Sequence, residues 1–94
     1  HWAIVLRDAY NKFDVQVTPA LFSNAFAYGE RSLAINPLIK PFHNFYDVLV
    51  LKIKAQFNYI NDNGLALDNS KIELIANFCY QFARVTVTKA KKYL

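Results

Sequence analysis

The chain has 94 residues, of which 54% are hydrophobic and 16% aromatic, and its formal net charge is +4. This length fits one small domain, and so many apolar residues exclude an intrinsically disordered chain. The single cysteine excludes an internal disulfide, and no apolar run is long enough to predict a membrane-spanning helix. Because a domain this small buries only part of its apolar surface, we expect it to bury more by pairing with a second copy.

The first half of the chain predicts two helices joined by an extended link. Apolar residues recur at helical spacing over residues 1–13, which predicts a short first helix. Thr18 followed by Pro19 is typical of a helix start, with a capping hydroxyl and a proline in the first turn, so a second helix is expected over about 19–33. Gly29 lowers the helix propensity there, which indicates close packing against another helix.

A third helix is expected over about 42–60, and it is apolar on nearly every side. Its polar residues form only a narrow strip, made of Lys52, Lys54, Gln56 and Asn58. A helix that is apolar all round is usually surrounded by protein, so this one should be the centre of a bundle or lie between its own domain and a partner. The residues expected at a dimer or partner interface are Phe45, Val48, Leu49, Leu51, Ile53, Phe57 and Ile60.

The last helix is expected to follow a polar loop. Asn-Asp-Asn-Gly at 61–64 faintly resembles a calcium loop, but Tyr59 and Ser70 would occupy positions that need carboxylates, so we read it as a helix stop. Asp68 is typical of an N-cap, and the helix after it should run to about Lys91. The whole chain, 1–94, is therefore expected to be a single all-α domain, a bundle of four or five helices that forms a two-fold dimer through its central apolar helix.

Two further predictions concern the beginning of the chain and its basic end. The chain starts at His1 without a methionine, so we expect a terminal or processed piece of a longer protein. The basic residues near the other end would bind nucleic acid or anionic lipid, or would simply favour the negative C-terminus of a helix, and we favour the second reading. They are Arg84, Lys89, Lys91 and Lys92.

No pattern in the chain indicates catalysis. There is no phosphate loop, dinucleotide fingerprint, nucleophile elbow or zinc-protease motif. Cys79 with His43 would make a poor nucleophile and base, because the aromatic neighbours of Cys79 should raise its pKa. We therefore expect no enzyme, cofactor, metal or small-molecule substrate. Cys79 is expected to be either a buried apolar side chain or an intermolecular disulfide.

Asp47 is the acid that stands out, because it enters the apolar third helix between Tyr46 and Val48. A buried carboxylate there would need a partner, and Arg7 and Arg31 on the first two helices are the candidates for a salt bridge. The alternative is that Asp47 lies in the first helical turn, where a negative charge is favourable and still hydrated.

Two segments of the chain resemble the C-terminal domain of spidroins, the spider silk proteins. They are LFSNAFAYGERSLAINP at 21–37 and YDVLVLKIKAQF at 46–57. Asn36-Pro37 resembles the break that follows the family's second helix, and Asp-Val-Leu-Val at 47–50 resembles the motif that opens its apolar helix. The resemblance covers nearly the whole chain in layout. Its sequence matches are confined to short patches, and this chain is richer in Phe, Tyr, Asn and Lys than the family.

The resemblance implies a secreted, five-helix, two-fold dimer that keeps silk protein soluble and aligns chains during fibre assembly. It implies that Asp47 forms a salt bridge with an arginine of an early helix, Arg7 or Arg31. The family's dimer-linking cysteine corresponds to Tyr46 here, and Cys79 lies elsewhere. The expected function is thus a non-enzymatic assembly domain. The alternatives are an accessory subunit that docks into a larger complex and, less favoured, a basic nucleic-acid-binding module.

Overall fold

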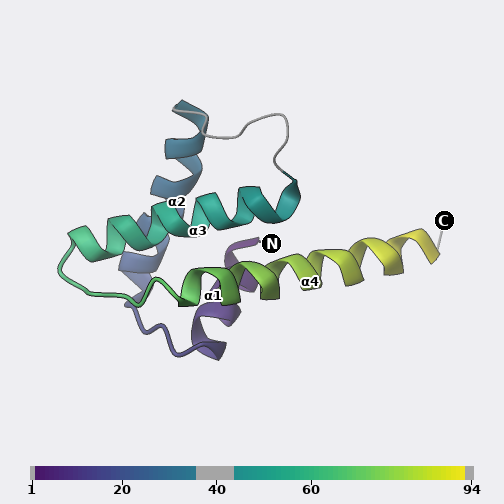
Figure 1. The fold of residues 1–94 in the computed structure, drawn as a ribbon, viewed down its shortest axis with the longest axis horizontal. Helices are drawn as coiled ribbons and strands as arrows, with labels where there is room; N and C mark the ends of the chain where they lie inside the picture. Colours follow the sequence, from purple (N-terminus) through teal and green to yellow (C-terminus); the bar gives the residue numbers. More distant parts are fainter. Residues whose placement is uncertain (1, 36–43, 93–94) are drawn as a thin grey trace.

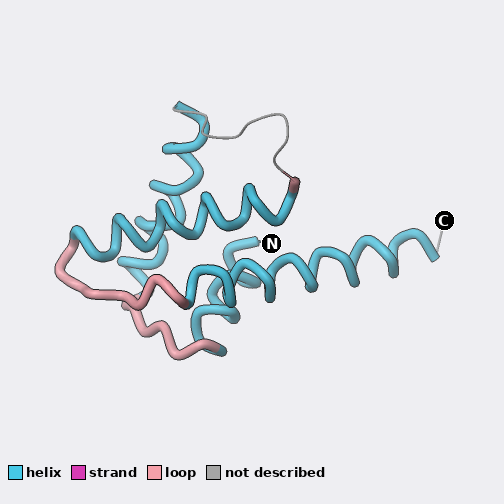
Figure 2. Tube along the Cα trace, viewed as in Figure 1, coloured by secondary structure: helices cyan, strands magenta, loops and turns pink. Residues whose placement is uncertain are grey.

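A computed structural model describes residues 2–35 and 44–92, with the side chains of residues 35 and 85–92 left out. Within these residues the fold has no strand and consists of α1 (Trp2–Lys12), α2 (Pro19–Ile35), α3 (Phe45–Asp62) and α4 (Lys71–Lys92). The all-α prediction is confirmed for the part of the chain described. These residues form four helices, where four or five were expected. Figures 1 and 2 show α3 beside α4, with α2 crossing α3. The last turns of α4 run past the other helices (Figure 1).

α2 and α3 begin where a short polar side chain accepts a free backbone N–H of the first turn. At the start of α2 the backbone N–H of Leu21 donates to Thr18 Oγ1 at 3.2 Å, as the Thr-Pro pair predicts. α4 begins at Lys71, so Asp68, which was expected as its N-cap, lies in the turn before the helix, where its carboxylate accepts the backbone N–H of Ser70 at 2.9 Å. This hydrogen bond is the main reason that the pKa of Asp68 is lowered. The β-favouring residues at 86–88 remain helical in the backbone of α4.

α3 begins at Phe45, later than the expected start at about 42. Asn44 is its N-cap, and the side chain of Asn44 accepts the backbone N–H of Asp47 at 2.9 Å. The carboxylate of Asp47 in turn accepts the backbone N–H of Asn44 at 3.2 Å. This reciprocal pair is a capping box, which satisfies two donors at once and fixes where the helix starts.

The core lies where the helices meet, and Tyr10 of α1 stands at its centre with 1% of its surface exposed. Its ring packs edge-on against Phe22 of α2, with centroids 5.1 Å apart, and against Phe57 of α3 at 5.8 Å. α3 packs against both α2 and α4, and α1 packs against α4. The expected central helix is therefore α3.

Gly29 marks the closest approach of α2 to α3, as its presence within a helix predicted. A Cβ added at this position would lie 3.2 Å from the backbone oxygen of Lys52 and 3.2 Å from Cγ of Gln56. Any larger residue would have to push the α3 backbone away. The prediction of close packing at Gly29 is confirmed.

Gln56 was expected in the hydrated strip of α3, and this expectation is wrong. Its side chain is buried, with 1% exposed, and its Oε1 accepts the hydroxyl of Tyr10 at 2.8 Å. The reason is geometric: Gln56 follows Ile53 by three residues and precedes Ile60 by four, so it shares the face that those residues bury. Lys54 and Asn58 are exposed, as expected.

Candidate functional site

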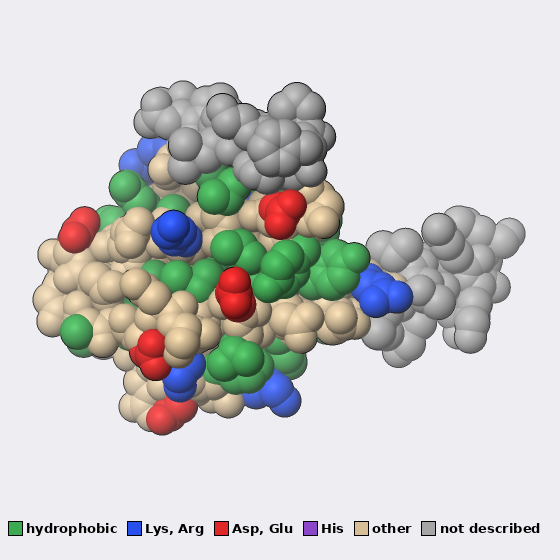
Figure 3. Space-filling view, in the orientation of Figure 1, with side chains coloured by type: hydrophobic (Ala, Val, Ile, Leu, Met, Phe, Trp, Pro, Cys, Tyr) green, Lys and Arg blue, Asp and Glu red, His purple; other side chains and the backbone are tan. Residues whose placement is uncertain are grey.

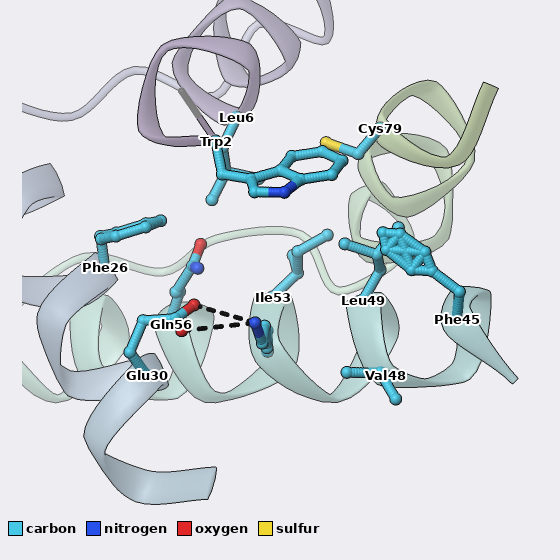
Figure 4. A pocket seen from close by; sticks show the side chains of 11 residues that line it. Trp2, Leu6, Phe26, Glu30, Phe45, Val48, Leu49, Ile53, Gln56 and Cys79 are labelled. Carbon is cyan, nitrogen blue, oxygen red and sulfur yellow. Dashed lines mark hydrogen bonds and ion pairs between the residues drawn. The ribbon is translucent and has the colours of Figure 1, made fainter. Parts of the chain in front are cut away.

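All four helices of the described chain border a groove of about 350 Å³ (Figure 4). α3 supplies the longest part of its lining, and α1, α2 and α4 supply its sides. The lining residues are Trp2, Leu6, Phe26, Glu30, Phe45, Val48, Leu49, Lys52, Ile53, Gln56 and Cys79. Most of these side chains are apolar, so the groove offers an apolar surface at the meeting point of the bundle.

The charged groups of the groove form one ion pair. Lys52 Nζ lies 3.2 Å from Glu30 Oε1 and 3.3 Å from Glu30 Oε2, as the dashed lines of Figure 4 show. The two side chains are 33% and 45% exposed, so solvent screens them and the pair contributes little to stability. Gln56 lies beside them with its amide oxygen held by Tyr10. The lining therefore has a polar end with no net charge.

A cluster of aromatic side chains lies at one edge of the groove. We call Trp2, Phe45, Tyr46, Tyr80 and Arg84 the aromatic patch. Trp2 contacts Phe45 edge-on with centroids 5.8 Å apart, and Phe45 lies 6.3 Å from Tyr80. Tyr80 also contacts Tyr46 at 5.9 Å, and the Arg84 guanidinium lies over the Tyr80 ring at 6.0 Å. Figure 3 shows hydrophobic side chains gathered in a band across the face of the molecule that it draws.

The patch is open to solvent even though the core is closed. Trp2 is 41% exposed and Phe45 is 42% exposed. Singly exposed apolar residues are ordinary on protein surfaces, but contiguous aromatic side chains are typical of surfaces that bind another molecule.

The residues expected at the partner interface separate into two groups. Leu49, Ile53, Phe57 and Ile60 belong to the chain's own core, with 7% or less of each exposed. Phe45, Val48 and Leu51 keep part of their surface accessible. A partner that meets the folded chain can therefore contact only the second group.

The expected salt bridge of Asp47 with Arg7 or Arg31, all three of them described residues, is not formed. The Asp47 carboxylate serves the capping box of α3, so the alternative of a first-turn position describes it. Arg7 lies over the ring of Phe22, 5.3 Å from its centroid, and Arg31 is exposed. The spacing Asn-x-x-Asp at 44–47 is a capping-box pattern that could have indicated this role from the sequence.

Cys79 is a free thiol, fully buried in the core. Burial raises its pKa to about 11, so the sulfur stays protonated and unreactive near neutral pH. A sulfur with no exposed surface cannot reach a cysteine of another chain without opening the fold. The expectation of an intermolecular disulfide is therefore replaced by its alternative, a buried apolar side chain.

Two classes of feature are absent from the described residues. They contain no group of three or more His, Cys, Asp or Glu side chains placed to hold a metal ion. Of the helices in the residues described, none has the length and hydropathy that crossing a membrane requires. The side chains of Lys89, Lys91 and Lys92 and the whole of His43 lie outside the description.

No family model, curated protein or solved structure matches the chain. The described residues thus form a small all-helical domain with an apolar groove and an exposed aromatic patch.

Proposed function

We propose that this chain is a non-enzymatic helical assembly domain that pairs with a second copy of itself through the aromatic patch. The observation that carries the proposal is the exposure of Trp2 and Phe45 in direct contact with each other, beside a core that is already filled. Trp, Tyr, Phe and Arg are the side chains enriched at protein interfaces, and all of them occur in this patch.

A two-fold dimer suits such a patch because it places the same surface of both copies in contact. Each aromatic ring that becomes buried would contribute about 1.5–3 kcal/mol, and several such rings must together exceed the cost of association. Val48 and Leu51 extend the patch along α3 and remain partly accessible. The proposed interface thus keeps three of the α3 residues expected from the sequence and replaces the buried ones with Trp2, Tyr46, Tyr80 and Arg84.

The resemblance to spidroin C-terminal domains supports the same role, because those domains are assembly modules. It adds a setting to the proposal, a secreted silk-like protein whose chains are aligned by this domain. An arrangement in which α3 buries its main apolar stripe against a second α3 is not part of the proposal, since that stripe faces the chain's own core.

Light scattering behind a sizing column, over a hundredfold range of protein concentration, tests the proposal. We expect a dimer whose dissociation constant rises at least about tenfold in Phe45→Ser and in Trp2→Ser, as for interface hot spots. Leu74→Ser is the matched control, because Leu74 is 47% exposed and lies outside the patch. Circular dichroism checks that each variant remains helical.

Two results would overturn the proposal. A monomer at every concentration would remove self-association and favour docking onto a different protein. A dimer that the Leu74 variant weakens as much as the patch variants would place the interface elsewhere.

A further inference from the structure

We propose that the groove binds one neutral small molecule with an apolar body and a single hydroxyl or carbonyl group at one end. This inference does not rest on the assembly role, since it concerns what one folded chain can hold, but the groove and the proposed interface share Trp2, Phe45 and Val48. The size of the groove, the chemistry of its lining and the pairing of its two charges define such a ligand.

The size and lining fit a small ligand. Protein sites for small molecules commonly enclose about 300–1,000 Å³ and are lined by apolar and aromatic side chains with a few polar groups, and this groove has about 350 Å³ and such a lining. Its lining includes Leu6, Val48, Leu49 and Ile53, whose side chains would offer no hydrogen bonds to water. An apolar ligand body would displace water from this lining with a favourable free energy.

The polar end selects the head group of the ligand. Glu30 accepts hydrogen bonds, Lys52 donates them, and the amide of Gln56 has N–H donors in addition to the oxygen that Tyr10 occupies. A hydroxyl can donate to Glu30 and accept from Lys52, and a carbonyl can accept from Lys52 or Gln56. A carboxylate would be repelled by Glu30 and an ammonium by Lys52, and either would have to break the ion pair.

The groove is accessible, and it contains a natural reporter. Trp2 and Phe45 line it and are both more than 40% exposed, so a ligand can enter at that edge without opening the core. Trp2 is the single tryptophan of the chain. Its emission therefore reports on the groove without interference from another indole.

The test uses N-phenyl-1-naphthylamine, a neutral apolar fluorophore with one N–H. We expect its emission to rise and that of Trp2 to fall along one saturable curve with one probe per chain. 1-Decanol should displace the probe at a concentration at least about tenfold lower than decanoate or decylammonium. A linear, unsaturable signal, or equal displacement by either ion, would overturn the proposal.

Substitutions in the groove and beside it test whether the probe binds there. Val48→Phe should fill the groove and weaken probe binding at least about tenfold, whereas Leu51→Phe, on α3 but outside the lining, should bind as the wild type does. Glu30→Gln removes the negative charge at a position that is 45% exposed, and decanoate should then compete about tenfold better. Unchanged binding in Val48→Phe, or unchanged decanoate competition in Glu30→Gln, would overturn the assignment.

The protein concentration separates this site from the proposed dimer. Because the proposed dimer would cover Trp2 and Phe45 at the edge where a ligand enters, titrations well below any dimer midpoint should give the full affinity per chain, and titrations well above it a weaker one. Binding that appears only in the dimer would place the probe between two copies and would overturn the groove as its site, without affecting the assembly role.

Discussion

The hydroxyl of Tyr10 donates to the amide oxygen of Gln56 at 2.8 Å, and both side chains are 1% exposed. This hydrogen bond joins α1 to α3 across 46 residues of sequence. Burial, with a smaller contribution from Cys79, raises the pKa of Tyr10, so the phenol remains a donor throughout the physiological range. A buried polar pair of this kind stabilises the fold only while both members are present.

Removing one partner should therefore cost more than removing both. Tyr10→Phe leaves the Gln56 oxygen buried without a donor, and we expect the free energy of unfolding to fall by about 1–3 kcal/mol. Gln56→Leu should cost a similar amount by leaving the Tyr10 hydroxyl unsatisfied. Urea unfolding of the single variants and of the double variant measures the coupling. Strict additivity would show that the two groups do not depend on each other.

A glycine-to-alanine substitution usually stabilises a helix, but the contact at Gly29 predicts that it destabilises this protein. In an open helix position alanine is more favourable by about 1 kcal/mol, so Ala27→Gly at an exposed site of α2 should destabilise the protein by about that amount. Gly29→Ala should also destabilise it, by about 1–3 kcal/mol, because the added methyl meets the backbone oxygen of Lys52 at 3.2 Å. Thermal unfolding of both variants gives the comparison. A gain in stability at Gly29 would show that α2 and α3 can move apart at little cost.

The capping box at the start of α3 predicts that Asn44 and Asp47 each stabilise the helix. Asn44→Ala and Asp47→Ala should each lower the free energy of unfolding by about 1 kcal/mol through loss of a capping hydrogen bond. The effects of Asp47→Ala and Arg7→Gln should add, because Arg7 contacts Phe22 and not Asp47. Denaturant titrations of the two single variants and the double variant test this. A coupling above about 0.5 kcal/mol would restore the salt bridge that the sequence suggested.

The buried thiol predicts slow chemistry at neutral pH. A pKa of about 11, raised from 9.0, lowers the thiolate fraction of Cys79 roughly 100-fold at pH 8. We therefore expect the native protein to react with an aromatic disulfide reagent at least about 100-fold more slowly than the protein in urea, since burial also blocks access. The absorbance of the released thiol measures both rates. Equal rates would show that the α1–α4 contact opens freely.

The same thiol predicts how stability changes in alkali. Folding favours the neutral form of Cys79, so its contribution is complete below pH 9.0 and is lost as the pH rises towards 11. Tyr10 acts in the same direction at higher pH. Unfolding midpoints measured between pH 8 and 11 should fall, and they should fall less steeply in Cys79→Ala. An identical slope in that variant would assign the loss to other groups.

Local sequence signals predicted much of the helical layout. The Thr18-Pro19 pair gave the start of α2 correctly, and the apolar spacing gave the stripe through Ile53, Phe57 and Ile60. These features depend on hydrogen bonds and periodicity within a few residues, which a sequence contains directly. The apolar spacing alone predicts too early a start for α3, because it does not include the cap at Asn44.

Features that depend on packing between helices could not be predicted from local sequence signals. Helical spacing places Gln56 on the buried face, but its burial is tolerated only because Tyr10 of α1 reaches it, and no local pattern shows that contact. The groove joins residues of four helices, from Trp2 to Cys79, so its existence follows from their mutual packing. For the same reason the sequence identified α3 as central but could not tell which of its apolar residues the chain itself would cover.

The pairing of α1 with α4 determines the order in which this protein can fold. Lys71 Nζ donates to the carbonyl of Phe13 across 58 residues, and the rings of Phe13 and Phe78 meet edge-on. Closing so long a loop is entropically costly, whereas α2 and α3 are near neighbours in the sequence. Of these helices α1 would be synthesised first, and Phe13 at its end would lack its partners Lys71 and Phe78 until α4 is synthesised. Completion of the core therefore has to follow the synthesis of α4, and a chain that ends before α4 would expose α1 to aggregation.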